Sequence, residues 1–209
     1  MKPTIRWWWL CILFVALTAE SLVSSPSRAV AQLWERYLSG YHGPYRGRVI
    51  DAETKKPLEG AAVVAVWDRE TVWVFQTNTG FWQAREVLTG ANGEFVLDAE
   101  DIELKAPSRT LRPTFVIFYP GYGSFPRFGR ATRNLVGGNF EGPGSDVELP
   151  RLKTKKERLE KLISPYELFH SAHEDLSDVP YKYTPNLVRL INAERITLEL
   201  QPYTPKEKR

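Results

Sequence analysis

The chain has 209 residues and a formal net charge of +3. This length suits one domain with appendages and allows a core that needs no disulfides. The small charge does not indicate a nucleic-acid partner. Cys11 is the only cysteine.

The first 31 residues have the pattern of a secretory signal peptide. Two basic residues precede an apolar run over 7–19, and residues 29–31 read A-V-A, which is a cleavage sequence. The run is shorter than the ~20 residues of a transmembrane helix; an uncleaved anchor is the alternative. Cleavage would remove Cys11, three basic residues and one acidic residue, and would lower the net charge from +3 to +1. We expect a periplasmic or secreted protein with no disulfide and no membrane span after cleavage.

Residues 32–44 are predicted to be a lead-in segment. Trp34 and Leu38 lie four apart, on one face of a short helix. Glycine and proline then break the helix. We expect Trp34 to pack against the side of the domain that follows.

Two strands separated by a charged turn are predicted next. Residues 46–50 end in two β-branched residues, which favour a strand. Residues 51–57 carry the charge and the proline of a turn. Residues 61–67 are apolar at nearly every position, which is typical of a strand buried on both faces.

The segment 67–82 is rich in aromatic residues. Trp73 and Phe75 alternate with other residues as in a strand, and 78–80 (Asn-Thr-Gly) has the composition of a turn, so an elongated hairpin is predicted. Its rings either fill the core or cap one open end of the domain, or they form a stacking surface for a sugar or a partner protein. In the second case Trp73 and Trp82, which flank the predicted turn, are the exposed pair.

Asn92-Gly93 gives the strongest hairpin signal in the chain. Both residues tolerate a positive φ, so the pair fits a type I′ turn. We expect this turn to join 85–88 to 94–97 as two antiparallel strands.

Two further strands are predicted over 114–119 and 146–152, with a glycine-rich loop over 121–144 between them. The loop contains no phosphate-binding glycine motif. A loop this long inside a compact domain is usually functional or mobile. Three of its arginines recur at every third residue and either meet an anionic surface or are scattered solvated charges. They are Arg127, Arg130 and Arg133.

After the last strand the composition becomes that of short amphipathic helices. The first is predicted over 153–163. Ser164-Pro165 and Thr184-Pro185 are helix-start signals, and they precede predicted helices over 166–176 and 187–200. We expect these helices to pack on the strands because short helices are unstable alone; the alternative is a docking arm for a partner.

Three motifs in this order resemble the carboxypeptidase regulatory-like domain family. They are G-x-V-x-D at Gly47, Val49 and Asp51, P-L-x-G-A-x-V from Pro57 to Val63, and T-G-x-N-G-x-F from Thr89 to Phe95. Residues 114–122 are similar to the late strand and glycine-containing turn of that family. The resemblance covers about residues 45–152. It implies a bacterial exported protein with a seven-stranded transthyretin-like Greek-key β-sandwich. The family serves as a scaffold beside many functions, so no activity is implied.

The predicted organisation therefore has four parts. They are a signal peptide at 1–31, a lead-in segment at 32–44, a mainly β sandwich at 45–152 and a helical carboxy-terminal extension at 153–209.

The sequence carries no convincing active site. The H-x-x-E zinc signature of the carboxypeptidases is absent, and no nucleophile or carboxylate pair stands out with a partner. His170, His173 and Glu174 can share one helix face and so fit a metal ion; the alternative is a solvated helix end. We expect no enzymatic activity, no cofactor and no metal site.

The interpretation that these observations favour is an exported, non-catalytic binding or assembly module. Its expected partner is a protein or a glycan of the cell envelope, and no nucleic acid. The candidate binding residues are Trp73, Phe75 and Trp82 of the hairpin and Arg127, Arg130 and Arg133 of the loop. The first alternative is a carbohydrate-binding module with Trp73 and Trp82 coplanar, and the second is a metal-dependent protein using His170 and His173.

Overall fold

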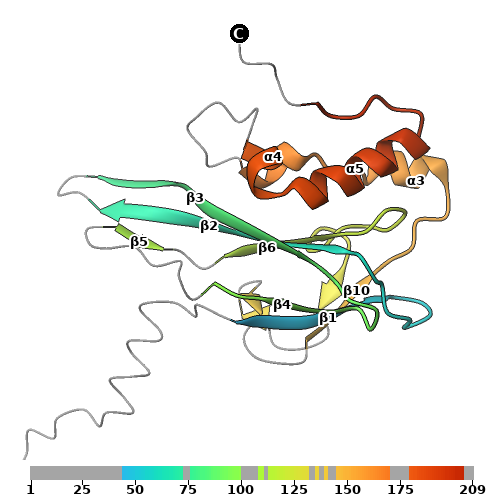
Figure 1. Ribbon diagram of the computed structural model, residues 1–209, viewed down its shortest axis with the longest axis horizontal. Helices are drawn as coiled ribbons and strands as arrows, with labels where there is room; N and C mark the ends of the chain where they lie inside the picture. Colours follow the sequence, from blue (N-terminus) through green and yellow to red (C-terminus); the bar gives the residue numbers. More distant parts are fainter. Residues whose placement is uncertain are drawn as a thin grey trace, which may run out of the picture. The chain divides into compact units, whose positions relative to one another are not determined.

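The computed structural model describes residues 44–72, 76–99, 108–110, 113–131, 135–136, 139–140, 145–169 and 179–204. All of them belong to one compact unit, Gly40–Arg209. The predicted signal peptide and residues 32–43 of the lead-in segment lie outside the described residues. The described part is mainly β, with helices toward the carboxy-terminal end (Figure 1), as the sequence predicts.

The strands form two sheets. The first sheet contains, in order, β4 (Glu94–Leu97), β1 (Tyr45–Asp51), β10 (Ser145–Leu149) and β7 (Arg130–Ala131). The second contains β3 (Thr77–Leu88), β2 (Ala62–Val72) and, both on the other side of β2, β5 (Ser108–Thr110) and β6 (Thr114–Phe118). A separate pair consists of β8 (Leu135–Val136) and β9 (Asn139–Phe140). β1 and β10 run parallel, and the remaining pairs are antiparallel.

The strand β2 has an apolar residue at nearly every position because both of its faces are covered. Val63, Ala65 and Trp67 point into a core between the two sheets. Ala62 and Val64 point to the other side, into a core beneath the helices. Successive side chains of a strand alternate between faces, so the predicted double burial is confirmed.

Three of the described helices cover the outer face of the second sheet (Figure 1). They are the 3₁₀ helix η1 (Pro165–Phe169), α4 (Val179–Tyr183) and α5 (Pro185–Thr197). The helix α3 (Lys155–Glu160) has no buried residue. Leu187 and Ile191 of α5 are 0% exposed in the second core, and burial of each such side chain stabilises the fold by about 1.5–3 kcal/mol. The prediction that the helices pack on the strands is therefore confirmed for η1, α4 and α5.

The predicted hairpin at Asn92-Gly93 is wrong. β4 pairs with β1 of the first sheet, in the register Gly47↔Phe95, while β3 belongs to the second sheet. Gly93 has a φ of 73°, but Asn92 is not among the residues with a positive φ, and a type I′ turn needs both. The turn therefore carries the chain from one sheet to the other.

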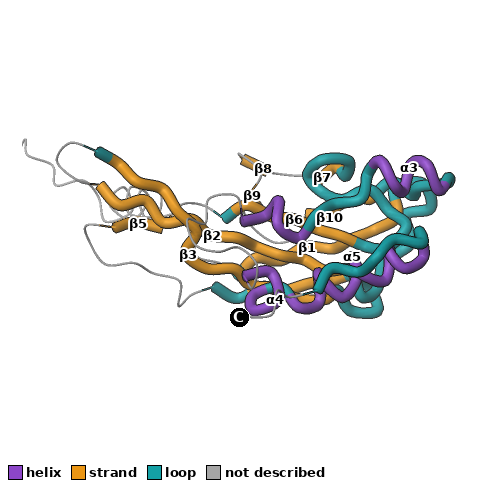
Figure 2. The backbone as a smooth tube through the Cα atoms, turned by 90° about the horizontal axis from the view of Figure 1, so that it is seen from above, coloured by secondary structure: helices purple, strands orange, loops and turns teal. Residues whose placement is uncertain are grey.

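The predicted hairpin of the aromatic segment is confirmed, but its turn is misplaced. β2 and β3 pair along their whole length, and Figure 2 shows them continuing together beside β5. Asn78, Thr79 and Gly80 lie within β3, and the chain reverses between Val72 and Thr77 instead. The β-branched threonines favour a strand at this position more strongly than asparagine and glycine favour a turn.

The helix predicted over 166–176 is shorter where the structure describes it. Its described part, 166–169, belongs to the 3₁₀ helix η1, and 170–178 lie outside the described residues, so the remainder stays a prediction. The helix predicted over 153–163 is present as α3, which a capping box of Thr154 and Glu157 begins.

Candidate functional site

The three sequence motifs meet in space and hold the loops at the ends of β1, β2 and β3. The Thr89 hydroxyl oxygen accepts a hydrogen bond from Ala61 N at 2.9 Å and donates one to Leu58 O. Gly93 O accepts from Val49 N at 2.8 Å, and Val49 O accepts from Leu58 N at 3.0 Å. These residues satisfy buried main-chain groups, so their role is to fix the fold.

Asp51, the last motif residue of β1, is a buried carboxylate with structural partners. Its Oδ1 accepts from Glu53 N and Thr54 N at 2.8 Å each, and its Oδ2 accepts from the Tyr122 hydroxyl at 2.8 Å. Burial raises the pKa of Asp51, but these hydrogen bonds outweigh burial and hold it below its ordinary value. Burial, and then the bond to Asp51, raises the pKa of Tyr122 to about 12. The pair closes a turn and is poorly suited to accept a substrate proton.

Glu194 of α5 is a second buried carboxylate, 2% exposed. It pairs with Arg158 of α3 through two bonds of 2.7 and 2.6 Å, and it also accepts from Gly121 N at 3.0 Å. The bond to Glu194 raises the pKa of Arg158. This ion pair joins α3, α5 and the loop after β6, so its role is also structural.

Trp82 is the one predicted aromatic site residue that the structure describes. Trp67 pairs with Gln83 and Asp68 with Phe81, so Trp82 is the extra residue of a β-bulge. Bulges re-aim side chains, and here Trp82 is 36% exposed. The guanidinium carbon of Arg69 lies 5.5 Å from its ring centre, within the range of a cation–π interaction. Trp67, in contrast, is 1% exposed in the core.

The remaining predicted aromatic and metal residues fall outside the described part. They are Trp73 and Phe75 of the hairpin, and His170, His173 and Glu174 of the predicted metal set. The coplanarity of Trp73 and Trp82 therefore stays a prediction, as does the metal set. Within the described residues, no group of three or more His, Cys, Asp or Glu side chains is placed to hold a metal ion.

The predicted arginines do not share one described cavity. Arg127 lines a small cavity of about 150 Å³ together with Phe125 and Ile163. Its guanidinium lies 5.3 Å from the ring of Phe128. Arg130 lies in β7, opposite Glu148 of β10, and is exposed. Arg133 lies outside the described residues.

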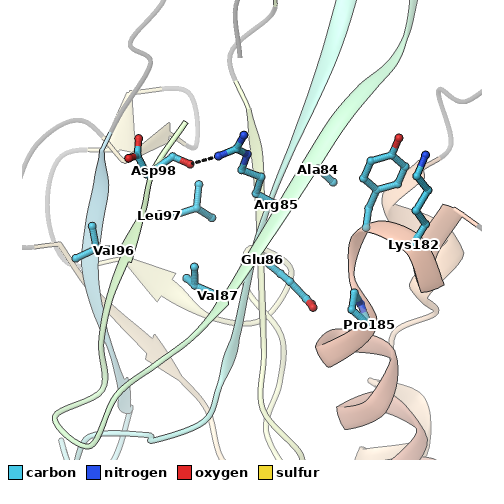
Figure 3. Close-up of a pocket in the computed structure, with 10 residues that line it drawn as sticks. Ala84, Arg85, Glu86, Val87, Val96, Leu97, Asp98, Lys182 and Pro185 are labelled. Atoms are coloured by element: carbon cyan, nitrogen blue, oxygen red, sulfur yellow. Dashed lines mark hydrogen bonds between the residues drawn. The ribbon is translucent and has the colours of Figure 1, made fainter. Parts of the chain in front are cut away.

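A groove that sequence reasoning missed lies along β3 (Figure 3). Its volume is about 570 Å³, and it is lined by 84–87 of β3, by 96–98 in and after β4, and by Lys182, Tyr183 and Pro185 of the helical layer. The volume falls within the ~300–1,000 Å³ of ligand-binding clefts. Since its walls come from three distant parts of the sequence, no local pattern marks it.

Glu86 fixes the helical wall of this groove. Its carboxylate accepts from Asn186 N, Asn186 Nδ2 and Leu187 N at 2.7, 3.0 and 3.0 Å. The predicted cap residue Thr184 makes no side-chain bond to the start of α5, and its hydroxyl donates to Pro180 O instead. A glutamate one hundred residues earlier therefore supplies the helix cap.

Comparisons with known proteins found no matching family model, no matching curated protein and no matching solved structure. Among the described helices, none combines the length and the apolar character that crossing a membrane requires.

Proposed function

We propose that this protein is an exported, non-catalytic binding or assembly module of the cell envelope, periplasmic or secreted. We further propose that its strands form a transthyretin-like Greek-key β-sandwich of the carboxypeptidase regulatory-like family. The use of all three motifs in one set of main-chain hydrogen bonds supports this resemblance, because it accounts for their residue types and order.

A non-catalytic role is supported by how the chain uses its buried carboxylates. Asp51 and Glu194 each accept hydrogen bonds on both oxygens from groups of the fold. A general base needs a lone pair directed at a substrate and a pKa near the working pH. The pKa of Asp51 lies below its ordinary value, which does not suit that role.

The exposed ring of Trp82 is the observation that carries the binding proposal. Tryptophan is highly buried on average, yet here a bulge presents the ring to solvent and Arg69 lies against it. Rigid aromatic side chains beside arginine are the usual anchors of protein interfaces. The partner is therefore a protein or a glycan of the envelope that packs on this ring.

A carbohydrate-binding module is the second candidate. The flat ring of Trp82 offers an apolar surface for a sugar, and Arg69 is positioned beside it to hydrogen-bond sugar hydroxyl groups. A metal-dependent role through His170 and His173 remains the least supported proposal, since it has no described observation behind it.

The test is co-sedimentation of the purified protein with isolated cell envelopes. Trp82→Ala is expected to weaken binding at least tenfold. Ile196→Ala is the matched control because Ile196 is also an exposed apolar residue, 63% exposed, on the helical layer. Equal binding by Trp82→Ala and the native protein would refute the proposal.

Two further treatments separate the candidates. Binding that survives protease digestion of the envelopes assigns a glycan, and binding that is lost assigns a protein. Binding that a chelator abolishes in the native protein would favour the metal-dependent alternative.

A further inference from the structure

The outer edge of β3 has main-chain groups available for another strand. Within the described part of the chain, β3 is paired on one side only, with β2. Thr89, directly after β3, donates its N–H to Ala61 O at 3.0 Å. Antiparallel strands alternate residues that bond the neighbour with residues that face away. Arg85 and Val87 therefore bond β2, while Glu86 and Leu88 direct their N–H and C=O groups outward.

The neighbouring edge of the first sheet is partly closed. By the same alternation, Gly93 bonds β1 through Val49 N, so Val96 and Asp98 face away from it. The outward carbonyl of Asp98 already accepts from Arg85 Nη1 at 3.2 Å (Figure 3). A side chain that covers an edge in this way discourages strand addition, so the open edge is that of β3.

This edge is recessed between two walls. Figure 3 shows β4 on one side of β3 and the helical layer on the other. Residues 96–98, in and after β4, line one side, where Leu97 is 1% exposed, and Tyr183 and Pro185 line the other. An added strand would turn alternate side chains toward each wall.

We propose that this groove binds an extended peptide segment of a partner protein, which adds as a strand beside β3 at Glu86 and Leu88. The groove between the two walls has a volume of about 570 Å³, which suits a single extended segment. A second copy of this protein does not fit in the same way, because pairing its own recessed β3 would bring both sets of walls together. The peptide site is independent of the Trp82 surface, so failure of one does not imply failure of the other.

The side chains of the groove define the chemistry of the peptide. Val87 is half-buried, lines the groove on the side of the first sheet, and favours an apolar peptide residue there. The carboxylate of Glu86 is engaged by α5, whereas Lys182 is exposed and its ammonium lies 4.8 Å from the Tyr183 ring. An acidic residue on the helical side of the peptide therefore complements Lys182. The proposed binding mode is therefore β-strand addition, in which main-chain hydrogen bonds hold the peptide and pockets select its alternate side chains.

The probe is a synthetic array of octapeptides in which Val, Ile or Leu alternates with Thr or Ser, with and without one Glu. The tightest binder is then made in solution in two N-methylated forms, one for each set of alternate residues. We expect the unmethylated peptide to bind with a Kd below about 1 mM. Only one of the two methylated forms should lose affinity, by at least tenfold, because only one set of amides faces β3. Absence of binding, or equal effects of both forms, overturns the proposal.

Hydrogen exchange measured by NMR locates the strand. In the free protein the amides of Arg85 and Val87 are expected to be protected, and those of Glu86 and Leu88 to exchange rapidly. Bound peptide should slow the exchange of the Glu86 and Leu88 amides at least tenfold. Protection of the Glu86 and Leu88 amides in the free protein overturns the proposal. If that protection increases with protein concentration, a second copy of this protein occupies the groove.

Lys182→Glu tests the charge of the groove. We expect this variant to bind the Glu-containing peptide at least tenfold more weakly and to bind the uncharged peptide with unchanged affinity. Because Lys182 is exposed, the variant should keep the native fold, and circular dichroism checks this. Equal affinities for both peptides in the variant and the native protein would contradict the assigned acidic position.

Discussion

Replacing Thr89 by valine should destabilise the protein strongly although the two side chains have the same shape. Thr89 is 3% exposed, and its hydroxyl is the hydrogen-bond partner of both Ala61 N and Leu58 O. Valine would leave these two buried main-chain groups unpaired. Each unpaired group costs about 1–3 kcal/mol. We therefore expect the free energy of unfolding to fall by about 2–6 kcal/mol, a large part of the ~5–15 kcal/mol that stabilises a typical domain.

The assay is urea denaturation followed by tryptophan fluorescence, since Trp67 is 1% exposed in the core and reports its loss. Thr89→Ser is the matched control because it keeps the hydroxyl and removes one methyl group, which costs about 1 kcal/mol. The valine variant should therefore be the less stable of the two. If both variants unfold at the same urea concentration, the hydroxyl does not hold the loops and the structural account of the motif is wrong.

Three other variants test separate contacts of the fold. Gly93→Ala should cost more than Gly60→Ala, because a Cβ on Gly93 would overlap Val49 O. Gly60 has a similar positive φ but open space around it, so its replacement should cost only the ~1–2 kcal/mol of that conformation; urea denaturation compares the two variants. Arg158→Met should lower the melting temperature more than Glu194→Gln, because Glu194 left alone is 3% exposed, whereas Arg158, at 25%, can reach water. Because burial raises the pKa of Tyr122 from 10.0 to about 12, the unfolded state binds fewer protons than the native state in this window. Stability should fall as pH rises from about 10 to 12, and Tyr122→Phe should reduce that slope in denaturation curves at pH 9 and 11.5.

Elements that local chemistry determines were predictable from the sequence. The apolar run of β2 and the Thr184-Pro185 signal before α5 mark a strand and a helix where the structure has them. The partner of β4 was not predictable, because the turn signal at Asn92-Gly93 is local and the choice of sheet is not. That choice depends on contacts such as Gly47 with the ring of Phe95, where a Cβ on Gly47 would lie 2.8 Å from the ring.

The candidate sites were less predictable than the fold for a related reason. The sequence marks Trp82 as a candidate because it lies beside a predicted turn, but that turn is misplaced, and the sequence does not show the register shift that makes Trp82 the extra residue of a bulge. In the groove, Glu86 has the sequence character of a solvated charge on a strand. It is instead the cap of α5, and only the packed structure brings residues 86 and 186 together.

The position of Glu86 links the helical layer to the proposed peptide site. Its side chain holds the start of α5, and its main-chain groups face the groove. A substitution of Glu86 would therefore release the wall that carries Tyr183 and Pro185 as well as alter the strand edge, and its loss of binding would have two causes. Lys182 carries no main-chain role at the strand edge, because it lies in α4, where it is exposed and its ammonium lies 4.8 Å from the Tyr183 ring. A helix capped by the strand it flanks stands beside that strand, so the contact that holds α5 also places Tyr183 and Pro185 along the edge of β3.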